Sequence, residues 1–316
     1  MLRFVIGCAL AVLCGTVTAQ GWPAKPVRVV VPYSAGGGAD TVSRILFAKV
    51  GEDLGQQFVI ENRAGGGATI GPAIVAKAPA DGYTVLYHGT AHSINPALVP
   101  NLPYDTQKDF IPVFLAAQVP NLLVVYPQVP EKTVAEVIAA AKNGPGLDFA
   151  SSGNGSVQHL ALELFRVMTG GKISHVPYKG GGPALNDLMG GHIKYFFSNA
   201  SSSTPFVKAG QIRAIAHTGR GRLASFPDLP PVSDTVPGFE AYEWNGVFVP
   251  AGTPADVVNR LNAALNAALR SPKIMERLAS LSVQAQPNTP AQFGAFFQSE
   301  VEKWTRVIKE SNIKLE

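Results

Sequence analysis

The hydrophobic pattern predicts buried strands that each lead through a short loop into a helix. Residues 29–31 are three consecutive valines, which is typical of a strand buried on both faces. A glycine turn at 36–38 follows, and the apolar residues between Val42 and Val50 then recur at helical spacing. The first turn of a helix leaves backbone N–H groups without intrahelical partners, at the positive end of the helix dipole. We therefore predict an anion-binding loop made of backbone amides, without a charged side chain.

The same unit recurs along the chain with short connections. Further short strands are predicted at 58–60, 83–87, 147–150, 173–176, 193–197, 212–216 and 247–249. Glycine loops comparable to the first one lie at 65–67, 153–155 and 180–182. Alternation of short strands and helices is typical of parallel βαβ units, so the predicted fold class is α/β.

Two interruptions in the pattern indicate a chain that passes twice between two lobes. Residues 118–121 separate two apolar segments, and residues 243–245 precede the strand at 247–249. We therefore assign residues 20–119 and 246–316 to lobe 1 and residues 120–245 to lobe 2. Ligands of open α/β sheets bind beyond the carboxyl ends of the strands. Two lobes that face each other there would enclose a small molecule in the cleft between them.

Helix start signals refine this picture. A capping box begins a helix at Thr133, and similar signals at Thr253 and Thr289 begin two helices that close the chain. Leu160, Leu164, Phe165 and Met168 are predicted on the buried side of the helix that follows the polar turn at 151–156, and Pro183 is placed at the first position of the helix after 180–182.

The first residues have the pattern of an export signal. Arg3 precedes an apolar stretch at 4–13, and Val17-Thr18-Ala19 fits the small-residue rule for cleavage. We predict a signal peptide over 1–19, cleavage after Ala19 and a periplasmic location. Both cysteines, Cys8 and Cys14, lie within that segment, so the mature chain has no disulfide, thiolate nucleophile or cysteine-bound metal.

Composition and charge narrow the functional classes. Of 316 residues, 46% are hydrophobic and 15% are charged, which is typical of a packed globular protein. The net charge of +4 comes from scattered residues without a basic run. Nucleic acid is therefore not an expected partner.

Motifs for cofactor chemistry are incomplete. The dinucleotide-binding fingerprint would need small residues at the positions that hold Thr41 and Gln158. A Walker A phosphate loop is excluded because no glycine is followed by Lys-Ser or Lys-Thr. The G-x-S-x-G elbow of serine hydrolases does not occur either. His88 and His92 are predicted to lie in a loop, because Gly89 and Pro96 interrupt a helix there, and they do not form a metal site. We predict no catalytic residue, no metal and no cofactor. An exported α/β enzyme and a nicotinamide-dependent oxidoreductase are the alternatives.

An ordered set of motifs identifies a resemblance that covers nearly the whole mature chain. It includes VVVPYSAGGGAD, VIENRAGGGATIG, DGYTVLYHGT, ASSGNGSVQHLALELF, HVPYKGGGPALNDLMGG and FVPAGTPADVVNRLN. This set resembles the Bug (TctC-type) receptors, the periplasmic solute-binding components of tripartite tricarboxylate transporters. The resemblance implies a two-lobed periplasmic binding protein (type II-like) that closes on a small carboxylate. It also implies that backbone amides and waters hold this ligand, without an arginine clamp.

The family's loops fall on residues 33–38, 151–156 and 178–183. The residues expected to bind the ligand are Tyr33, Ser34, Ala35, Gly36, Gly37, Thr90, Ser152, Gly153, Asn154, Ser156, His159, Tyr178, Lys179, Gly180, Gly181, Ser198 and Asn199. A structural role is the alternative for His159, which begins a helix. Many family members carry an aspartate where this chain has Ser198, so the resemblance favours a plain carboxylate over an amino acid. The expected partners are a small organic acid and membrane transporter subunits or a sensor, and the receptor is expected to be mostly monomeric.

Overall fold

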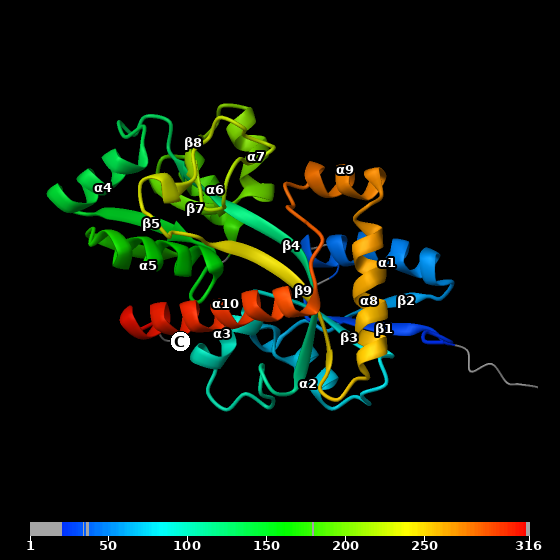
Figure 1. Cartoon of the computed structure of the whole chain (residues 1–316). Coiled ribbons are helices and arrows are strands. Elements are labelled where there is room, and N and C mark those ends of the chain that lie inside the picture. Colours follow the sequence, from blue (N-terminus) through cyan, green and yellow to red (C-terminus); the bar gives the residue numbers. More distant parts are fainter. Residues whose placement is uncertain (1–20, 34, 36–37, 179, 314–316) are drawn as a thin grey trace, which may run out of the picture.

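A twisted mixed sheet runs through the molecule and is covered by helices on both faces (Figure 1). The structure is a computed structural model, and it describes residues 21–33, 35, 38–178 and 180–313. Among these residues nine strands form the sheet: β1 (Val27–Val31), β2 (Phe58–Asn62), β3 (Thr84–Gly89), β4 (Phe110–Val125), β5 (Leu147–Ser151), β6 (Ile173–Pro177), β7 (Tyr195–Asn199), β8 (Arg213–His217) and β9 (Tyr242–Pro250). Their order is β2-β1-β3-β9-β4-β7-β5-β6, and β8 also pairs with β4.

The sheet has two halves that share the long strand β4. In the first half, β1 pairs in parallel with β2 and β3, and β9 pairs with β3 and with residues 110–120 of β4. In the second half, β5 pairs in parallel with β6 and β7, while residues 121–125 of β4 pair with β7 and β8. β4 and β9 are antiparallel to their neighbours, and together they run between the two halves (Figure 1).

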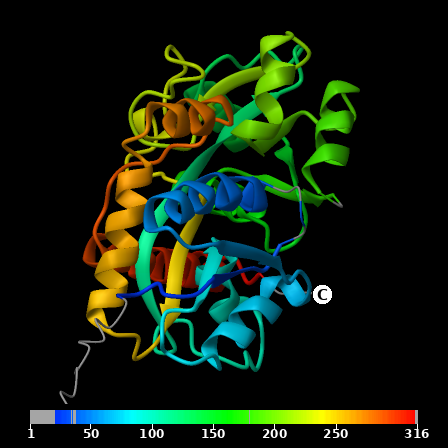
Figure 2. The ribbon, with the colours of Figure 1, turned by 90° about the vertical axis from the view of Figure 1, so that its right-hand side faces the viewer.

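The first half has a helix layer on each face of the sheet. One layer contains α1 (Gly38–Leu54), α8 (Ala255–Ala268) and α9 (Pro272–Ser280), with α1 packed on α8 (Figure 2). The other layer contains α2 (Ile70–Ala76), α3 (Ala91–Leu98) and α10 (Pro290–Glu310). Val29 packs toward the first layer and Val30 toward the second. This arrangement confirms that the run of valines is a strand buried on both faces.

The second half repeats this plan. α4 (Val134–Asn143) and α5 (Val157–Thr169) cover one face, and α6 (Gly181–Met189) and α7 (Ala200–Lys208) cover the other. Phe197 of β7 packs toward the α5 side and Phe196 toward the α6 side. Short 3-10 turns lie at Gly66–Ala68 and Val232–Asp234.

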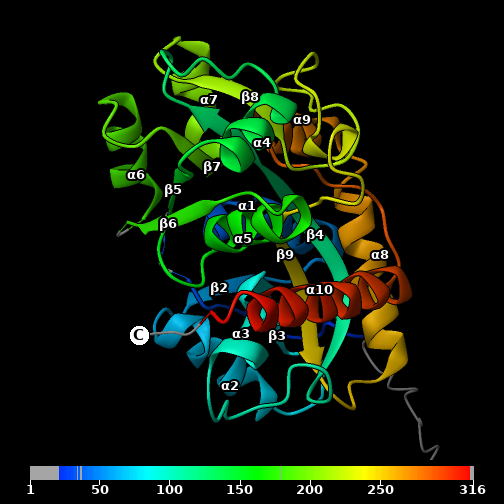
Figure 3. The same cartoon turned by 90° about the vertical axis from the view of Figure 1, so that its left-hand side faces the viewer.

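The C-terminal helix α10 contacts both halves. Its first turns place Phe293 and Phe297 in the core of the first half, and its last turns place Trp304 and Ile308 in the core around Phe165 of α5. Figure 3 shows α10 beside α3 and next to α5. α10 therefore packs with both halves of the sheet, and the lobe boundaries read from the sequence stay a prediction.

Several local predictions are confirmed and others are wrong. The capping boxes at Thr133 and Thr289 are both present. In contrast, residues 118–121 do not interrupt the strand, because β4 continues through them while its pairing passes from β9 to β7 and β8. Thr253 does not cap α8, since its hydroxyl donates to the Pro250 carbonyl.

Four further differences concern helices. α7 and α9 were not predicted, and α6 begins at Gly181, two residues before Pro183. Met168 lies on the exposed side of α5, with 38% of its surface accessible. The structure also places His92 inside α3, because that helix begins directly after β3 and includes Pro96.

Candidate functional site

The two glycine loops of the second half lie against each other. The backbone N–H of Tyr178 donates to the Ser151 carbonyl at 3.1 Å. A Cβ atom on Gly153 would lie 3.2 Å from the Tyr178 carbonyl oxygen, and one on Gly181 would lie 3.3 Å from Ser152 Oγ. Gly153 also has a φ of 124°, in a region that side-chain-bearing residues rarely adopt. The structure thus brings together two loops that the sequence predicts for ligand binding.

Helices α5 and α6 begin at these loops and differ in how they are capped. Ser156 caps α5: its hydroxyl accepts the His159 N–H at 3.2 Å and donates to the Gly153 carbonyl at 2.7 Å. Gly180 precedes α6 and has no side chain to cap it. The first amides of α6 therefore lack a side-chain acceptor at the positive end of the helix dipole.

His159 lies at this loop in a stacked pair with His175. The two ring centroids are 3.7 Å apart, and the rings are nearly parallel. Nδ1 of His159 accepts the Gly155 N–H at 3.1 Å, and Nε2 of His175 lies 2.5 Å from Ser151 Oγ. Burial is the main cause that lowers the pKa of His159 to about 3, and it also lowers the pKa of His175. These contacts give His159 a structural role in shaping the loop, whereas a ligand contact stays a prediction.

The other residues of the second half that are predicted to bind the ligand have side chains that are either exposed or already in contact with the protein. Asn154 is exposed, and Ser198 is buried within β7. The Tyr178 hydroxyl donates to Asp187 of α6 at 2.8 Å. Burial and this carboxylate raise the pKa of Tyr178 to about 12, so its hydroxyl is a neutral donor that the protein itself uses. Lys179 lies outside the described residues.

In the first half, Tyr33 lies two residues after the end of β1 and contacts β3. Its hydroxyl lies 3.1 Å from Nδ1 of His88, which also accepts the Gly89 N–H at 2.8 Å. A Cβ atom on Gly89 would lie 2.9 Å from the Tyr33 hydroxyl and 2.7 Å from Nδ2 of Asn245, so only glycine allows this close approach. Burial raises the pKa of Tyr33 well above its usual range. Ala35 is exposed, and the predicted residues Ser34, Gly36 and Gly37 lie outside the described residues.

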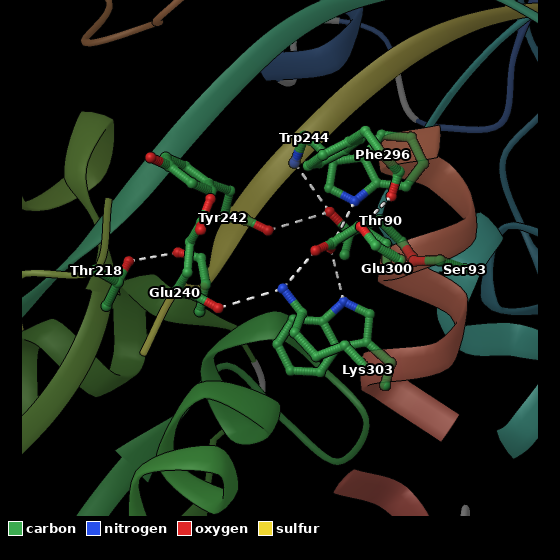
Figure 4. A network of polar contacts seen from close by, with 12 residues as sticks. Thr90, Ser93, Thr218, Glu240, Tyr242, Trp244, Phe296, Glu300 and Lys303 are labelled. Carbon is green, nitrogen blue, oxygen red and sulfur yellow. Dashed lines mark hydrogen bonds and ion pairs between the residues drawn. The ribbon is translucent and has the colours of Figure 1, made fainter. Parts of the chain in front are cut away.

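Thr90 is engaged by the crossing strand β9 (Figure 4). Its hydroxyl accepts the Trp244 N–H at 2.9 Å and lies 3.4 Å from the Tyr242 carbonyl, and the residue is buried. Thr90 was predicted to bind the ligand, but its hydroxyl instead forms hydrogen bonds that fix the backbone of β9.

The same figure shows further contacts around this part of β9. Nε1 of Trp244 donates to Glu300 of α10 at 3.0 Å, and Lys303 both pairs with Glu300 and donates to the Glu240 carbonyl at 3.2 Å (Figure 4). From the second half, the Thr218 hydroxyl donates to the Ala241 carbonyl. The backbone from residue 240 to residue 244 is thus held from α3, α10 and the second half of the sheet.

The start of α1 differs from the predicted amide-only anion site. Asp40 is buried in the first turn of this helix. Its carboxylate accepts hydrogen bonds from Arg44 Nε and Asn62 Nδ2, each at 3.0 Å, and the same Asn62 amide donates to the Tyr33 carbonyl. A carboxylate of the protein therefore already interacts with this helix end, and an arginine balances its charge.

A second carboxylate, Glu243 of β9, lies among the predicted site residues. Nε2 of Gln158, near the start of α5, donates to Glu243 Oε1 at 2.5 Å, and Nδ2 of Asn199, the N-cap of α7, donates to Oε2 at 2.7 Å. The charge of Glu243 is a minor cause, after burial, that raises the pKa of Tyr33. Burial raises the pKa of Glu243. Glu243 thus contacts the predicted site residue Asn199 directly.

Glu243 and Gln158 were missed as site residues. The hydrophobic pattern predicts a strand only from residue 247, whereas β9 begins at Tyr242. Within β9, Tyr242 and Trp244 are buried, while Glu243 and Asn245 are only partly buried. This alternation of polar and aromatic residues is a strand signal, and it would have placed both polar residues on one face.

His92 lies in an apolar environment, with its ring next to that of His88. The His92 ring stacks on Phe297, with centroids 5.3 Å apart, and packs edge-on against Phe110. Burial lowers the pKa of His92 to about 3, which keeps the ring neutral. No group of three or more His, Cys, Asp or Glu residues that could hold a metal is found in the described part of the chain.

Two surface hollows lie away from these loops. One of about 620 Å³ is lined by residues of α3, the 99–107 segment and α10, including Pro96, Tyr104 and Val301. The other, of about 660 Å³, continues along α10 past Thr305 and Lys309. Neither is lined by a residue predicted to bind the ligand.

Comparison with known proteins defines the class of this two-part fold. The family described as "Tripartite tricarboxylate transporter family receptor" matches residues 42–313, so the chain belongs to this receptor family. A UPF0065 protein from the tcbD-tcbE intergenic region of Pseudomonas sp. is 38% identical over 98% of this chain and 94% of the relative. Protein BugT of Bordetella pertussis is 35% identical over 99% of this chain and 98% of its own. The resemblance to the Bug receptors is thereby confirmed.

Solved structures agree with this assignment. R. palustris Rpa4515 with adipate is 37% identical, with a TM-score of 0.77, over 93% of this chain and 99% of its own. MatC from Rhodopseudomonas palustris with bound malate is 33% identical, with a TM-score of 0.72, over 91% of this chain and 100% of its own. The predicted α/β receptor fold is confirmed, and the chain is a solute-binding receptor of a periplasmic family and not an enzyme. Among the described helices, none combines the length and apolar character needed to span a bilayer.

Proposed function

We propose that this receptor captures a small organic carboxylate between two lobes and delivers it to transporter subunits in the membrane or to a sensor. The observation that carries the proposal is the pairing of the 151–156 and 178–182 loops beside the uncapped start of α6. The first amides of α6 are free of a side-chain cap and can receive a carboxylate at the positive helix end. Relatives in the same family with adipate and malate bound support the carboxylate class.

The proposed lobes follow the sequence boundaries, with residues 20–119 and 246–316 in one and 120–245 in the other. β4 and β9 connect the two halves of the sheet and would bend as the lobes close on the ligand. The mature receptor would begin at Gln20 in the periplasm, after cleavage behind Ala19, and would act as a monomer.

Residues of both halves would contribute to recognition. Backbone amides at 33–38, at 152 and 154, and at 179–182 would receive the carboxylate, because the N–H groups of Gly153, Gly155 and Ser156 already have acceptors within the protein. Asn199 and Tyr33 would flank the ligand from opposite lobes. Thr90 and Tyr178 would make only secondary contacts with the ligand, because their hydroxyls already form hydrogen bonds within the protein.

Titration calorimetry of the mature chain with adipate, malate and succinate tests this function. Gly181→Val places a branched side chain over the first amides of α6 and should weaken the tightest of these ligands roughly tenfold or more, since hydrogen bonds to a charged group contribute about 1.5–3 kcal/mol each. Ala255→Val is the matched control, because Ala255 is exposed and begins α8, another helix without a side-chain cap. Unchanged affinity in Gly181→Val would contradict the role of this helix end.

A further inference from the structure

We propose that Glu243 makes the site selective for carboxylates that also carry a hydrogen-bond donor, a hydroxyl or an ammonium group. The inference rests on the proposed function, because it concerns the ligand of the same site. In this proposal, Glu243 binds the hydroxyl or ammonium group of the ligand and not its carboxylate.

The carboxyl group of Glu243 is held in a fixed position. Gln158 and Asn199 donate one amide N–H each to its two oxygens, and these two residues come from the starts of α5 and α7. The flanking backbone is fixed in turn by Thr90 and by Thr218 (Figure 4). Each carboxylate oxygen can accept more than one hydrogen bond, so both retain capacity for a ligand donor.

The charge of Glu243 has no balancing cation in the described part of the chain. The fully buried carboxylates of the described chain each have one: Asp40 pairs with Arg44, Glu163 with Arg166 and Glu300 with Lys303. Around Glu243, no described lysine, arginine or histidine lies within ion-pair distance, and its described hydrogen-bond partners are two neutral amides. A carboxylate in such surroundings favours a donor or a cation from the ligand.

Glu243 and the start of α6 favour different ends of the ligand. A ligand carboxylate beside Glu243 would place two like charges together, whereas the start of α6 offers amides without a negative side chain cap. Asn245, two residues along the same face of β9, makes no side-chain hydrogen bond to another described residue and can serve either end. The sequence expectation of a plain carboxylate depended on Ser198, and Glu243 supplies the acidic group that Ser198 lacks.

A rival arrangement has Glu243 protonated and donating to a plain carboxylate. The proposed and the rival arrangement differ in the number of protons taken up when the ligand binds. Where Glu243 is ionised in the free receptor, a plain dicarboxylate that binds its protonated form takes up a proton, and the calorimetric enthalpy then depends on the ionisation enthalpy of the buffer. Binding of a hydroxyl or ammonium group to ionised Glu243 requires no uptake.

Matched ligand sets test the proposal by calorimetry. Succinate, malate and aspartate share one carbon chain and differ in carrying hydrogen, hydroxyl or ammonium at one carbon, and adipate with 2-aminoadipate forms a longer pair. In the unaltered receptor, the best donor-bearing member should bind roughly tenfold to a hundredfold more tightly than its plain counterpart. Glu243→Gln should lower this ratio to about threefold or less, while the plain counterpart keeps or gains affinity.

Controls make the result specific to Glu243. Glu240→Gln removes a negative charge three residues away, where Arg220 pairs with it, and should leave the ratio unchanged. Melting curves establish that the variants are folded, and Glu243→Ala gives a second variant if the glutamine form is unstable.

Two results would overturn the inference while leaving the proposed function intact. One is a plain carboxylate that binds as tightly as its donor-bearing counterpart, with or without proton uptake. The other is a ratio that Glu243→Gln does not change. If no member of either set binds to the unaltered receptor or to the variant, the proposed function fails, and this inference fails with it.

Discussion

The carboxylates near the starts of α1 and α5 lie in comparable places but differ in what balances their charge. Asp40 is buried in the first turn of α1 and pairs with Arg44, which lies one turn further along the same helix. Glu243 reaches the start of α5 from β9 and takes hydrogen bonds from neutral amides. The first arrangement is complete within the protein, whereas the second leaves a charge for which the described residues provide no cation.

This difference separates a structural carboxylate from a recognition carboxylate. A paired carboxylate at a helix start stabilises the helix and its neighbours. A carboxylate that is partly buried without a counter-ion lowers stability, and such a group is typically kept where a ligand uses it. Neutralising the two kinds of carboxylate should therefore have opposite effects on stability.

Glu300 extends the structural class and gives the largest expected effect. It is 4% exposed, accepts from Nε1 of both Trp244 and Trp304, and pairs with Lys303. Glu300→Ala would leave two indole donors and an ammonium group without their acceptor, so we expect a loss of about 3–5 kcal/mol in the free energy of unfolding. Urea denaturation measures this loss.

The neighbouring Glu302 is the control for Glu300. It is exposed on the same helix and accepts from Gln298, so Glu302→Ala should change the free energy of unfolding by only about 0.5 kcal/mol or less. A loss below about 1 kcal/mol for Glu300→Ala would show that α10 does not depend on this buried carboxylate.

Asp40→Ala should have the next largest effect. The substitution removes the acceptor for Arg44 and Asn62 and the negative charge at the start of α1. Because the guanidinium is half-exposed and screened by solvent, we expect a loss of about 2 kcal/mol, near the lower end for hydrogen bonds to a charged group.

Asp53 provides the matched comparison for Asp40 in the same helix. It is exposed and pairs with Lys49 at a spacing of four residues, so Asp53→Ala should cost only about 0.3–0.5 kcal/mol in urea denaturation. Equal losses for the two variants would mean that burial gives Asp40 no special role, and the contrast with Glu243 would weaken.

The sequence predicted the parts of the fold that depend on local pattern. Three consecutive valines, repeated glycine turns and the capping boxes at Thr133 and Thr289 are local signals, and each element they predicted is present. The continuity of β4 through Pro120 could not be predicted in this way. It depends on pairing with residues that lie far away in the sequence, first β9 and then β7 and β8.

The candidate site was predictable where it consists of backbone and not where it consists of long-range side-chain pairing. Glycine spacing indicated both second-half loops, and the structure brings them together. Thr90 and Tyr178 were predicted to bind the ligand, but the hydrogen-bond partners of their hydroxyls, Trp244 and Asp187, are set by tertiary contacts. Glu243 was missed because the strand was predicted to begin at 247, although its surroundings, from α5, α7 and β9 together, could not have been predicted locally.

Neutralising Glu243 should give the smallest change in stability, with a sign opposite to that for Asp40. Glu243→Gln preserves the shape of the side chain, but the new amide group would point its N–H at the amide N–H of Gln158 or Asn199. The amides of Gln158 and Asn121 can turn over to accept it, because Gln158 Nε2 contacts Asn121 Oδ1 at 3.1 Å and Asn121 Nδ2 is buried without a partner. The variant therefore avoids an unsatisfied donor and removes the cost of a partly buried charge.

The pH dependence identifies the origin of this gain. Burial raises the pKa of Glu243, so the unfolded chain, with a glutamate pKa of about 4.3, ionises before the folded one as the pH rises. The folded state then binds more protons than the unfolded state, and the stability of the unaltered protein falls from the unfolded pKa up to the folded pKa. Glu243→Gln should be neutral at about pH 4 and should gain roughly 1 kcal/mol or less at pH 7.5.

The difference between the two proteins at each pH is the quantity to measure, by urea denaturation without ligand. The buried histidines have lowered pKa values, so they destabilise both proteins equally as the pH falls below about 6.5, and their effect cancels in this difference. Glu240→Gln, beside Arg220, should show no such rise between pH 4 and pH 7.5. If Glu243→Gln instead loses stability at pH 7.5, Glu243 belongs with Asp40 and Glu300 among the structural carboxylates, and its charge would then be balanced within the protein instead of by a ligand.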